Sequence, residues 1–227
     1  MMLVHRLLIL FVYTLASPIF SAVYTMQPGS DLVGRIQYHK VSAQDTWFSI
    51  AYQYDVGHHE LRIANPKVHS LKKHLGKILI IPTQHILPPK SLRKGIVVNL
   101  AEKRLYFFAS STVLFTYPVG VGRDGWKSPS FKGRVIGKTI GPTWNVPKSI
   151  LAYYKKKYGK DHPKTVPPGP NNPLGNYLIR TSMPRILIHG TSDDTSVGKN
   201  ISSGCIRMYN RNIGELFHLV SSRTPIA

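Results

Sequence analysis

The sequence predicts an α+β protein that is mostly β, with a small βααβ unit followed by a larger β-rich domain of the sandwich or barrel kind. Short apolar runs bounded by glycine, proline and polar residues recur after Gly95, which is typical of strands. Residues 37–83 hold two helix-length segments between two strand-length segments. A C-terminal helix is predicted by four apolar residues at helical spacing: Ile213, Leu216, Phe217 and Val220.

The first 22 residues have the layout of a secretory signal peptide. A short basic start precedes an uncharged apolar run over residues 7–15, and small residues cluster between Ala16 and Ala22. The apolar run is shorter than the roughly 20 residues that a membrane-spanning helix needs. We therefore expect an exported, periplasmic protein, with an uncleaved membrane anchor as the alternative.

The net charge of +20, from 30 basic and 10 acidic residues, predicts attraction to polyanions. The sequence holds no recognisable nucleic-acid-binding module, so we expect no nucleic-acid partner. Anionic envelope polymers such as peptidoglycan fit an exported protein better. A generally basic proteome is the alternative explanation of the charge.

Residues 37–83 are expected to fold as a unit. A strand over 37–41 is followed by a helix that Asp45 or Thr46 can cap, because either side chain can accept a bond from the free first-turn N–H groups. A second helix is predicted over 58–64, and a strand over 77–82 closes the unit.

This order of elements resembles a LysM carbohydrate-binding module. The residues that match are Tyr38, Val41, Asp45, Thr46, Ile50, Ala51, Leu61, Asn65, Pro66, Ile80, Ile81 and Pro82. Gln44 and Trp47 replace the usual Gly and Leu. The resemblance implies glycan binding, and a simple spacer is the alternative. No metal site is expected, because the histidines of this unit have no carboxylate or cysteine partners at ligand spacing.

A linker is predicted over 84–94 and a second domain over 95–221. Its expected strands are 96–100, 104–108, 112–119, 134–137, 176–180 and 185–189, with a lysine-rich helix over 150–158. The proline-rich loop 161–175 is long, and long ordered loops are more often functional than idle. Because all of these segments follow Gly95, we expect that removing residues 23–90 leaves a folded domain.

Cys205 is the only cysteine of the chain. Thiols in oxidising compartments are normally paired, so a single thiol in an exported protein favours a chemical role. His189 ends an apolar run 16 residues earlier and can deprotonate a thiol. Gly204 allows a bend that exposes N–H groups to an oxyanion, and Arg207 can hold a substrate carboxylate. Taken singly, an inert buried cysteine and a core histidine are the ordinary interpretations.

The two segments that carry these residues resemble the motif of the L,D-transpeptidases of the YkuD type, in the periplasmic subgroup with an N-terminal LysM-like unit. The segments are His189-Gly190-Thr191 and Ser202-Ser203-Gly204-Cys205-Ile206-Arg207-Met208. Residues 95–99, 104–106, 118–122, 141–144 and 168–175 also match, so the resemblance covers about 37–220. One departure is Ser203, which stands where the family usually has His.

The resemblance implies a cysteine acyltransferase without a metal or organic cofactor. Cys205 would form a thioester with the third residue of a peptidoglycan tetrapeptide stem and release D-alanine, and His189 would donate and accept protons. The Gly190 carbonyl would orient His189, and the N–H groups of Gly204 and Cys205 would hold the oxyanion. The remaining expected substrate-binding residues are Thr191, Ser202, Ser203 and Arg207.

The implied acceptor is an amine, either of diaminopimelate, giving 3→3 cross-links, or of a lysine in an envelope lipoprotein. Carbapenems are implied as covalent inhibitors, since a β-lactam presents a strained carbonyl to the thiol. Two other functions stay open. One is an L,D-carboxypeptidase or cysteine peptidase with water as acceptor. The other is a non-catalytic LysM protein that binds the wall.

Overall fold

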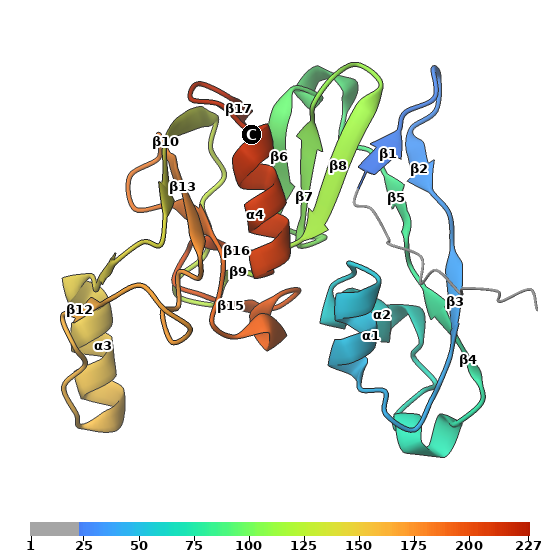
Figure 1. The fold of residues 1–227 in the computed structure, drawn as a ribbon, viewed down its shortest axis with the longest axis horizontal. Helices are drawn as coiled ribbons and strands as arrows, with labels where there is room; N and C mark the ends of the chain where they lie inside the picture. The colour runs from blue at the N-terminus through green and yellow to red at the C-terminus, as the bar shows by residue number, and fades with distance from the viewer. Residues whose placement is uncertain (1–22) are drawn as a thin grey trace, which may run out of the picture.

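The computed structural model describes residues 23–227 and shows a mostly β protein with four α-helices among them (Figure 1). The predicted signal peptide, residues 1–22, lies outside the described residues. Within 23–227, no helix is both long and apolar enough to cross a bilayer. The mostly β class expected from the sequence is confirmed.

The N-terminal unit follows the expected order strand, helix, helix, strand. β3 (Gln37–Lys40) pairs antiparallel with β4 (Ile78–Ile81), and α1 (Trp47–Gln53), α2 (His58–Ala64) and the 3-10 turn η1 (Leu71–His74) lie between them. Thr46 and Ser49 form a capping box that satisfies the free N–H groups at the start of α1. These elements enclose a small core of their own. The likeness to a LysM module stays a prediction.

The main sheet has nine strands in the order β1-β8-β7-β6-β17-β10-β13-β14-β16. Their bounds are β1 (Val23–Thr25), β6 (Gly95–Asn99), β7 (Arg104–Phe108), β8 (Val113–Pro118), β10 (Gly133–Ile140), β13 (Tyr177–Thr181), β14 (Leu187–His189), β16 (Ile206–Arg207) and β17 (Pro225–Ile226). The sheet bends around α4 (Asn210–Leu219), which stands between its two halves in Figure 1. The apolar face of α4 joins the strands in one core.

Three short strand pairs and two short turns complete the fold. β2 (Leu32–Gly34) pairs with β5 (Gln84–Ile86), β9 (Val121–Gly122) pairs with β15 (Asn200–Ser202), and β11 (Trp144–Asn145) pairs with β12 (Thr165–Val166). The 3-10 turns are η2 (Lys90–Leu92) and η3 (Asp194–Ser196). α3 (Lys148–Tyr158) has no buried residue and projects from the body together with β12 (Figure 1).

Residues on both sides of the N-terminal unit belong to the structure of the larger domain. β1 adds to the edge of the main sheet by pairing with β8. Met26, Val33 and Leu87 share a buried cluster with main-sheet residues such as Tyr106 and Leu114. Residues 84–94, expected as a linker, include β5, η2 and part of this cluster. The structure therefore argues against a folded domain after removal of 23–90, because that deletion opens the core.

Candidate active site

His189 ends β14, and Cys205 directly precedes the neighbouring strand β16 at the edge of the main sheet. β14 and β16 run parallel, with Ile188 opposite Ile206 and His189 opposite Arg207. Continuing this register by one residue places Cys205 beside Leu187. Alternate residues of a strand share a face, so His189, Cys205 and Arg207 lie on one face and the two isoleucines on the other.

His189 is buried, with 3 % of its surface exposed, and its orientation is fixed by its own loop. Its Nδ1 lies 2.6 Å from the carbonyl oxygen of Gly190. A carbonyl only accepts, so Nδ1 carries the proton and donates it, which leaves the lone pair on Nε2. Burial lowers the pKa of His189 to about 3, and the nearby Arg207 charge adds to this effect. The imidazole is therefore neutral at neutral pH and can accept a proton.

The Cys205 thiol is protonated and turned toward the preceding loop. Its Sγ donates to the carbonyl oxygen of Arg185 at 3.5 Å. Arg185 has a φ of 68°, in the left-handed region that residues other than glycine seldom adopt. Burial raises the pKa of the Cys205 thiol, while the Leu187 backbone and the Arg207 charge oppose that rise. Within residues 23–227, no hydrogen bond joins Cys205 to His189 in this conformation.

The turn that precedes Cys205 is held by two serine hydroxyls. Ser202 Oγ donates to the Cys205 carbonyl at 2.6 Å and accepts from the Gly204 N–H at 3.1 Å. Ser128 Oγ donates to the Gly204 carbonyl at 2.8 Å and accepts from the Gly122 N–H. Gly204 has a φ of 107°, which a side chain would make costly. Since the Gly204 N–H is engaged by Ser202, the Cys205 N–H is the better candidate for the oxyanion.

Among the expected substrate-binding residues, Ser202 and Thr191 are buried and use their hydroxyls inside the protein. Thr191 Oγ1 donates to the carbonyl of Asp193 and accepts from the N–H of the same residue. These two residues therefore shape the site. Ser203, next to Cys205 in the chain, is half-buried and remains a candidate for contact with the substrate.

Arg207 brings an unpaired positive charge to this face. In the described part of the chain, its guanidinium forms no ion pair, and its buried Nε has no hydrogen-bond partner. Burial lowers the pKa of Arg207, although Asp193 opposes that shift. A largely buried cation without a partner favours an anionic ligand, because a carboxylate would restore both the charge balance and the missing hydrogen bonds.

Asn210 is a site residue that the sequence analysis missed. It begins α4, its Nδ2 donates to the Thr191 carbonyl at 2.7 Å, and its Oδ1 accepts from the Asn176 N–H at 3.0 Å. A Cβ atom at Gly190 would collide with this Oδ1, so only glycine fits there. Asn210 thus fixes the loop whose carbonyl orients His189. No sequence signal marks it, because these loops meet only in the folded chain.

The proline-rich loop ends at the same place. Asn172 holds the loop together by donating to the carbonyls of Pro142 and Pro167, at 2.8 and 3.0 Å. Gly175 then packs against the backbone of Gly190 and Thr191. The end of the loop therefore borders the site, which agrees with a functional role for a loop of this length.

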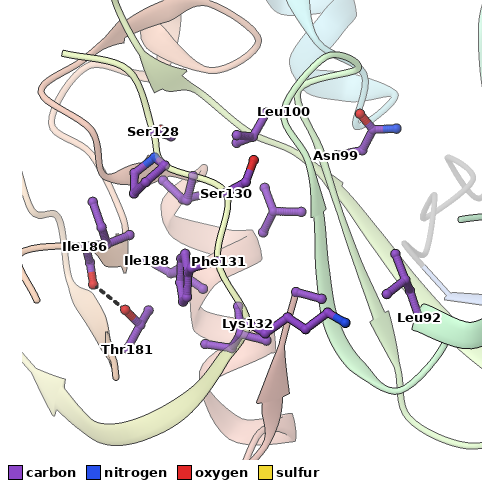
Figure 2. A pocket seen from close by; sticks show the side chains of 15 residues that line it. Leu92, Asn99, Leu100, Ser128, Ser130, Phe131, Lys132, Thr181, Ile186 and Ile188 are labelled. Atoms are coloured by element: carbon purple, nitrogen blue, oxygen red, sulfur yellow. Dashed lines mark hydrogen bonds between the residues drawn. The ribbon is translucent and has the colours of Figure 1, made fainter. Parts of the chain in front are cut away.

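A cavity of about 480 Å³ lies on the other face of the β14–β16 pair (Figure 2). Ile186, Ile188 and Ile206 form part of its apolar wall, and Ser128 lies at its border. Thr181 Oγ1, in the same wall, donates to the Ile186 carbonyl at 2.8 Å (Figure 2). Because the register turns Cys205 and His189 to the opposite face, this cavity lies behind the turn that carries Cys205. Among residues 23–227, no three or more His, Cys, Asp or Glu side chains gather as a metal site would require.

Comparison with known proteins gives consistent results. Residues 93–227 match the family model of the L,D-transpeptidase catalytic domain, YkuD. The probable L,D-transpeptidase YcfS of Escherichia coli is 37 % identical over 219 residues, which are 93 % of this chain and 68 % of that protein. The probable L,D-transpeptidase ErfK/SrfK of Salmonella typhimurium is 37 % identical over 208 residues, 89 % of this chain and 66 % of that protein. The chain thus spans about two thirds of the length of these relatives.

Among solved structures, the catalytic domain of the Enterococcus faecium L,D-transpeptidase acylated by ertapenem is similar at 19 % identity. Its TM-score is 0.45, and the match covers 59 % of this chain and 94 % of that one. The Ldtfm-avibactam carbamoyl enzyme is similar at 18 % identity with a TM-score of 0.46, over 65 % of this chain and 53 % of that one.

Proposed function

This chain belongs to the L,D-transpeptidase family and is an enzyme of that class, and from this premise we propose that it joins peptidoglycan stem peptides through a thioester on Cys205. The observation that carries the proposal is the state of His189. Its Nδ1 is committed to the Gly190 carbonyl, and its neutral Nε2 lies on the face that Cys205 shares. A neutral imidazole beside a lone thiol is the pair that acyl transfer requires.

The first step forms the acyl-enzyme. The Cys205 side chain turns from the Arg185 carbonyl toward His189, and Nε2 takes the thiol proton as Sγ attacks the carbonyl of the third stem residue. The Cys205 N–H stabilises the oxyanion. The C–N bond to the terminal D-alanine then breaks, the imidazolium returns the proton to the leaving amine, and D-alanine departs.

The second step transfers the acyl group. An acceptor amine replaces D-alanine, loses a proton to His189 as it attacks the thioester, and the C–S bond breaks to restore the thiol. The acceptor is an amine of a second stem, giving a 3→3 cross-link, or a lysine of an envelope lipoprotein. With water as acceptor, the same residues would make the protein an L,D-carboxypeptidase.

Arg207 is proposed to bind a carboxylate of the donor stem. Its unpaired, largely buried guanidinium lies on the face that Cys205 shares. A bidentate bond to a carboxylate would orient the peptide while supplying the partner that the described residues lack. Ser203, next to Cys205 in the chain, is proposed to contact the same peptide.

Export to the periplasm is proposed from residues 1–22 and from the substrate, which lies outside the cytoplasm. The charge of +20 favours attraction to the stem carboxylates. The N-terminal unit is proposed to hold glycan, in line with its LysM-like order of elements. Neither a metal ion nor an organic cofactor has a part in this chemistry.

Covalent labelling tests the nucleophile. Relatives of this family are known acylated by ertapenem and carbamoylated by avibactam, so we propose the same reactivity here. Intact mass spectrometry should show one meropenem equivalent on the parent protein and none on Cys205→Ala. Labelling of the folded Cys205→Ala variant would place the reaction elsewhere and refute the assignment.

A further inference from the structure

The first turn of α4 is held from two sides. On the inner side, Asn210 binds the loops at Asn176 and Thr191 that border the site. On the outer side, the next two residues, Arg211 and Asn212, bind a residue of the N-terminal unit. Three consecutive residues therefore connect that unit to the backbone that orients His189.

The residue on the outer side is Asp55, in the turn between α1 and α2. One oxygen, Oδ1, accepts from Arg211 Nη2 at 2.8 Å and from Asn212 Nδ2 at 2.9 Å. The Asp55 side chain is only 14 % exposed, so solvent screens these bonds less than at an open surface. Its own carbonyl accepts from the buried Arg104 at 3.3 Å. Asp55 is thus anchored to the larger domain through both its side chain and its backbone.

Aromatic rings extend the same contact. The Arg211 guanidinium lies 3.8 Å over the Tyr52 ring and donates to the Tyr52 carbonyl. Tyr52 also meets Tyr209, the residue before α4, edge to face at 4.9 Å. Tyr209 is fully buried. The contact between the units is therefore packed around the start of α4 and does not depend on one bond.

α4 lacks the groups that normally stabilise a helix start. Its N-cap, Tyr209, makes no side-chain capping bond, and its first turn has no acidic residue. The free N–H groups of a helix N-terminus favour a nearby negative charge. Asp55 supplies that charge from the other unit.

We propose that Asp55 is a positioning residue for acyl transfer: it fixes the first turn of α4, and through Asn210 it fixes the Gly190 carbonyl that orients His189. The N-terminal unit is then a structural part of the active site as well as a candidate glycan binder. The kinetic part of this inference rests on the proposed thioester chemistry, whereas the orientation of His189 does not.

Two substitutions of Asp55 separate the effect of its carboxylate from the effect of its backbone conformation. Asp55 has a φ of 52°, which glycine and asparagine tolerate better than other residues. Asp55→Gly removes the acceptor without adding strain, and Asp55→Asn keeps an oxygen that can accept from both donors. Asp45→Ala is the matched control, because Asp45 bonds only within the N-terminal unit, to His39 and to the Ser42 N–H. Arg211→Ala serves as the second variant if Asp55→Gly does not fold.

The readouts are the single-turnover rate of acylation by meropenem and the tautomer of His189 by nitrogen NMR of the imidazole. We expect Asp55→Gly to slow acylation by roughly 10- to 100-fold, because small misplacements of a catalytic group cost about that much. The meropenem concentration that gives half of the maximal rate should change little. Part of the Nδ1–H signal should move to Nε2–H. Asp55→Asn should restore the rate to within about threefold of the parent, since the acceptor geometry returns. Asp45→Ala should match the parent in both readouts.

An unchanged rate and tautomer in folded Asp55→Gly, or in Arg211→Ala where that variant replaces it, would overturn the inference. So would an equal loss in Asp45→Ala, which would show a general effect of destabilising the unit. If the parent itself did not react with meropenem, the proposed function would fail, and the tautomer signal would still decide the role of Asp55.

Discussion

The Nδ1 atom of His189 lies 2.6 Å from the carbonyl oxygen of Gly190, the next residue in the chain. This contact selects the tautomer with the lone pair on Nε2, and burial keeps the ring neutral. A histidine so arranged can serve as the proposed base with its direction already set before substrate binds, so the reaction does not have to order this side chain. The close approach of Asn210 requires glycine at position 190, which links the loop sequence to the chemistry.

Replacing the base should be far more damaging than replacing its neighbour in the motif. We expect His189→Gln to slow acylation by about two to four orders of magnitude, the usual contribution of a positioned acid–base group. Ser203→His should be tolerated, since position 203 is half-buried beside the pair. Stopped-flow measurement of meropenem acylation checks both variants. A Ser203→Ala variant as slow as His189→Gln would show that the base has been misassigned.

The pH dependence of acylation should show no histidine step near neutral pH. The pKa of His189 is lowered to about 3, so the imidazole is neutral and able to accept a proton above about pH 5. Burial raises the pKa of the Cys205 thiol, so the thiol still carries the proton that His189 takes during attack. The acylation rate should therefore stay level from about pH 6 to about pH 8, where neutral imidazole and neutral thiol are both present. A rate that rises with a midpoint near the ordinary histidine pKa of about 6.5 would contradict the lowered pKa of His189.

Removing the Arg207 charge should weaken use of a carboxylate-bearing donor. Arg207→Gln loses a charge-assisted contact of about 1.5–3 kcal/mol, which corresponds to roughly 10- to 100-fold in kcat/KM for the tetrapeptide. A donor whose carboxylates are amidated provides the control, because the variant and the parent should use it at similar rates. Equal losses of kcat/KM with both donors would show that Arg207 does not bind a carboxylate of the donor.

The ion pair between the units should contribute strongly to stability. Arg104 is 2 % exposed and donates to Glu60 Oε2 at 2.9 Å. Glu60→Ala leaves that guanidinium buried without its counter-charge, so we expect a loss of about 3–5 kcal/mol in the free energy of unfolding. Asp31→Ala removes an exposed pair with Arg93, so the free energy of unfolding should fall far less than in Glu60→Ala. Urea unfolding compares the two variants. Similar losses in the free energy of unfolding would contradict a strong contribution from the pair of Glu60 and the buried Arg104.

Local patterns predicted much of this fold. The helix over 58–64 was predicted at its observed bounds, because a polar start and an Asn65-Pro66 stop frame it. β1 and β17 were missed, since strands of three and two residues carry no period that a sequence could reveal. Their place is set by pairing with β8, β6 and β10, which is visible only in three dimensions.

The site shows the same limit. Cys205 and His189 could be found because their chemistry and their local context are both in the sequence. Asn210 and Asp55 could not be found, because each acts on residues far along the chain. Ser202 and Thr191 were expected at the substrate because of their place in the motif, whereas their burial assigns them to the support of the turns. Burial depends on packing, which a motif does not encode.

The central claim is that Cys205 transfers the acyl group of a tetrapeptide stem to an amine. The most direct measurement is mass spectrometry of muropeptides after purified protein is incubated with peptidoglycan rich in tetrapeptides, alongside Cys205→Ala. The account predicts 3→3 cross-linked dimers with release of one D-alanine per bond, or stems joined to a lysine when a lipoprotein acceptor is present, and neither product with Cys205→Ala. Tripeptides alone would make the enzyme a carboxypeptidase, and cross-linked dimers formed by Cys205→Ala would contradict the mechanism.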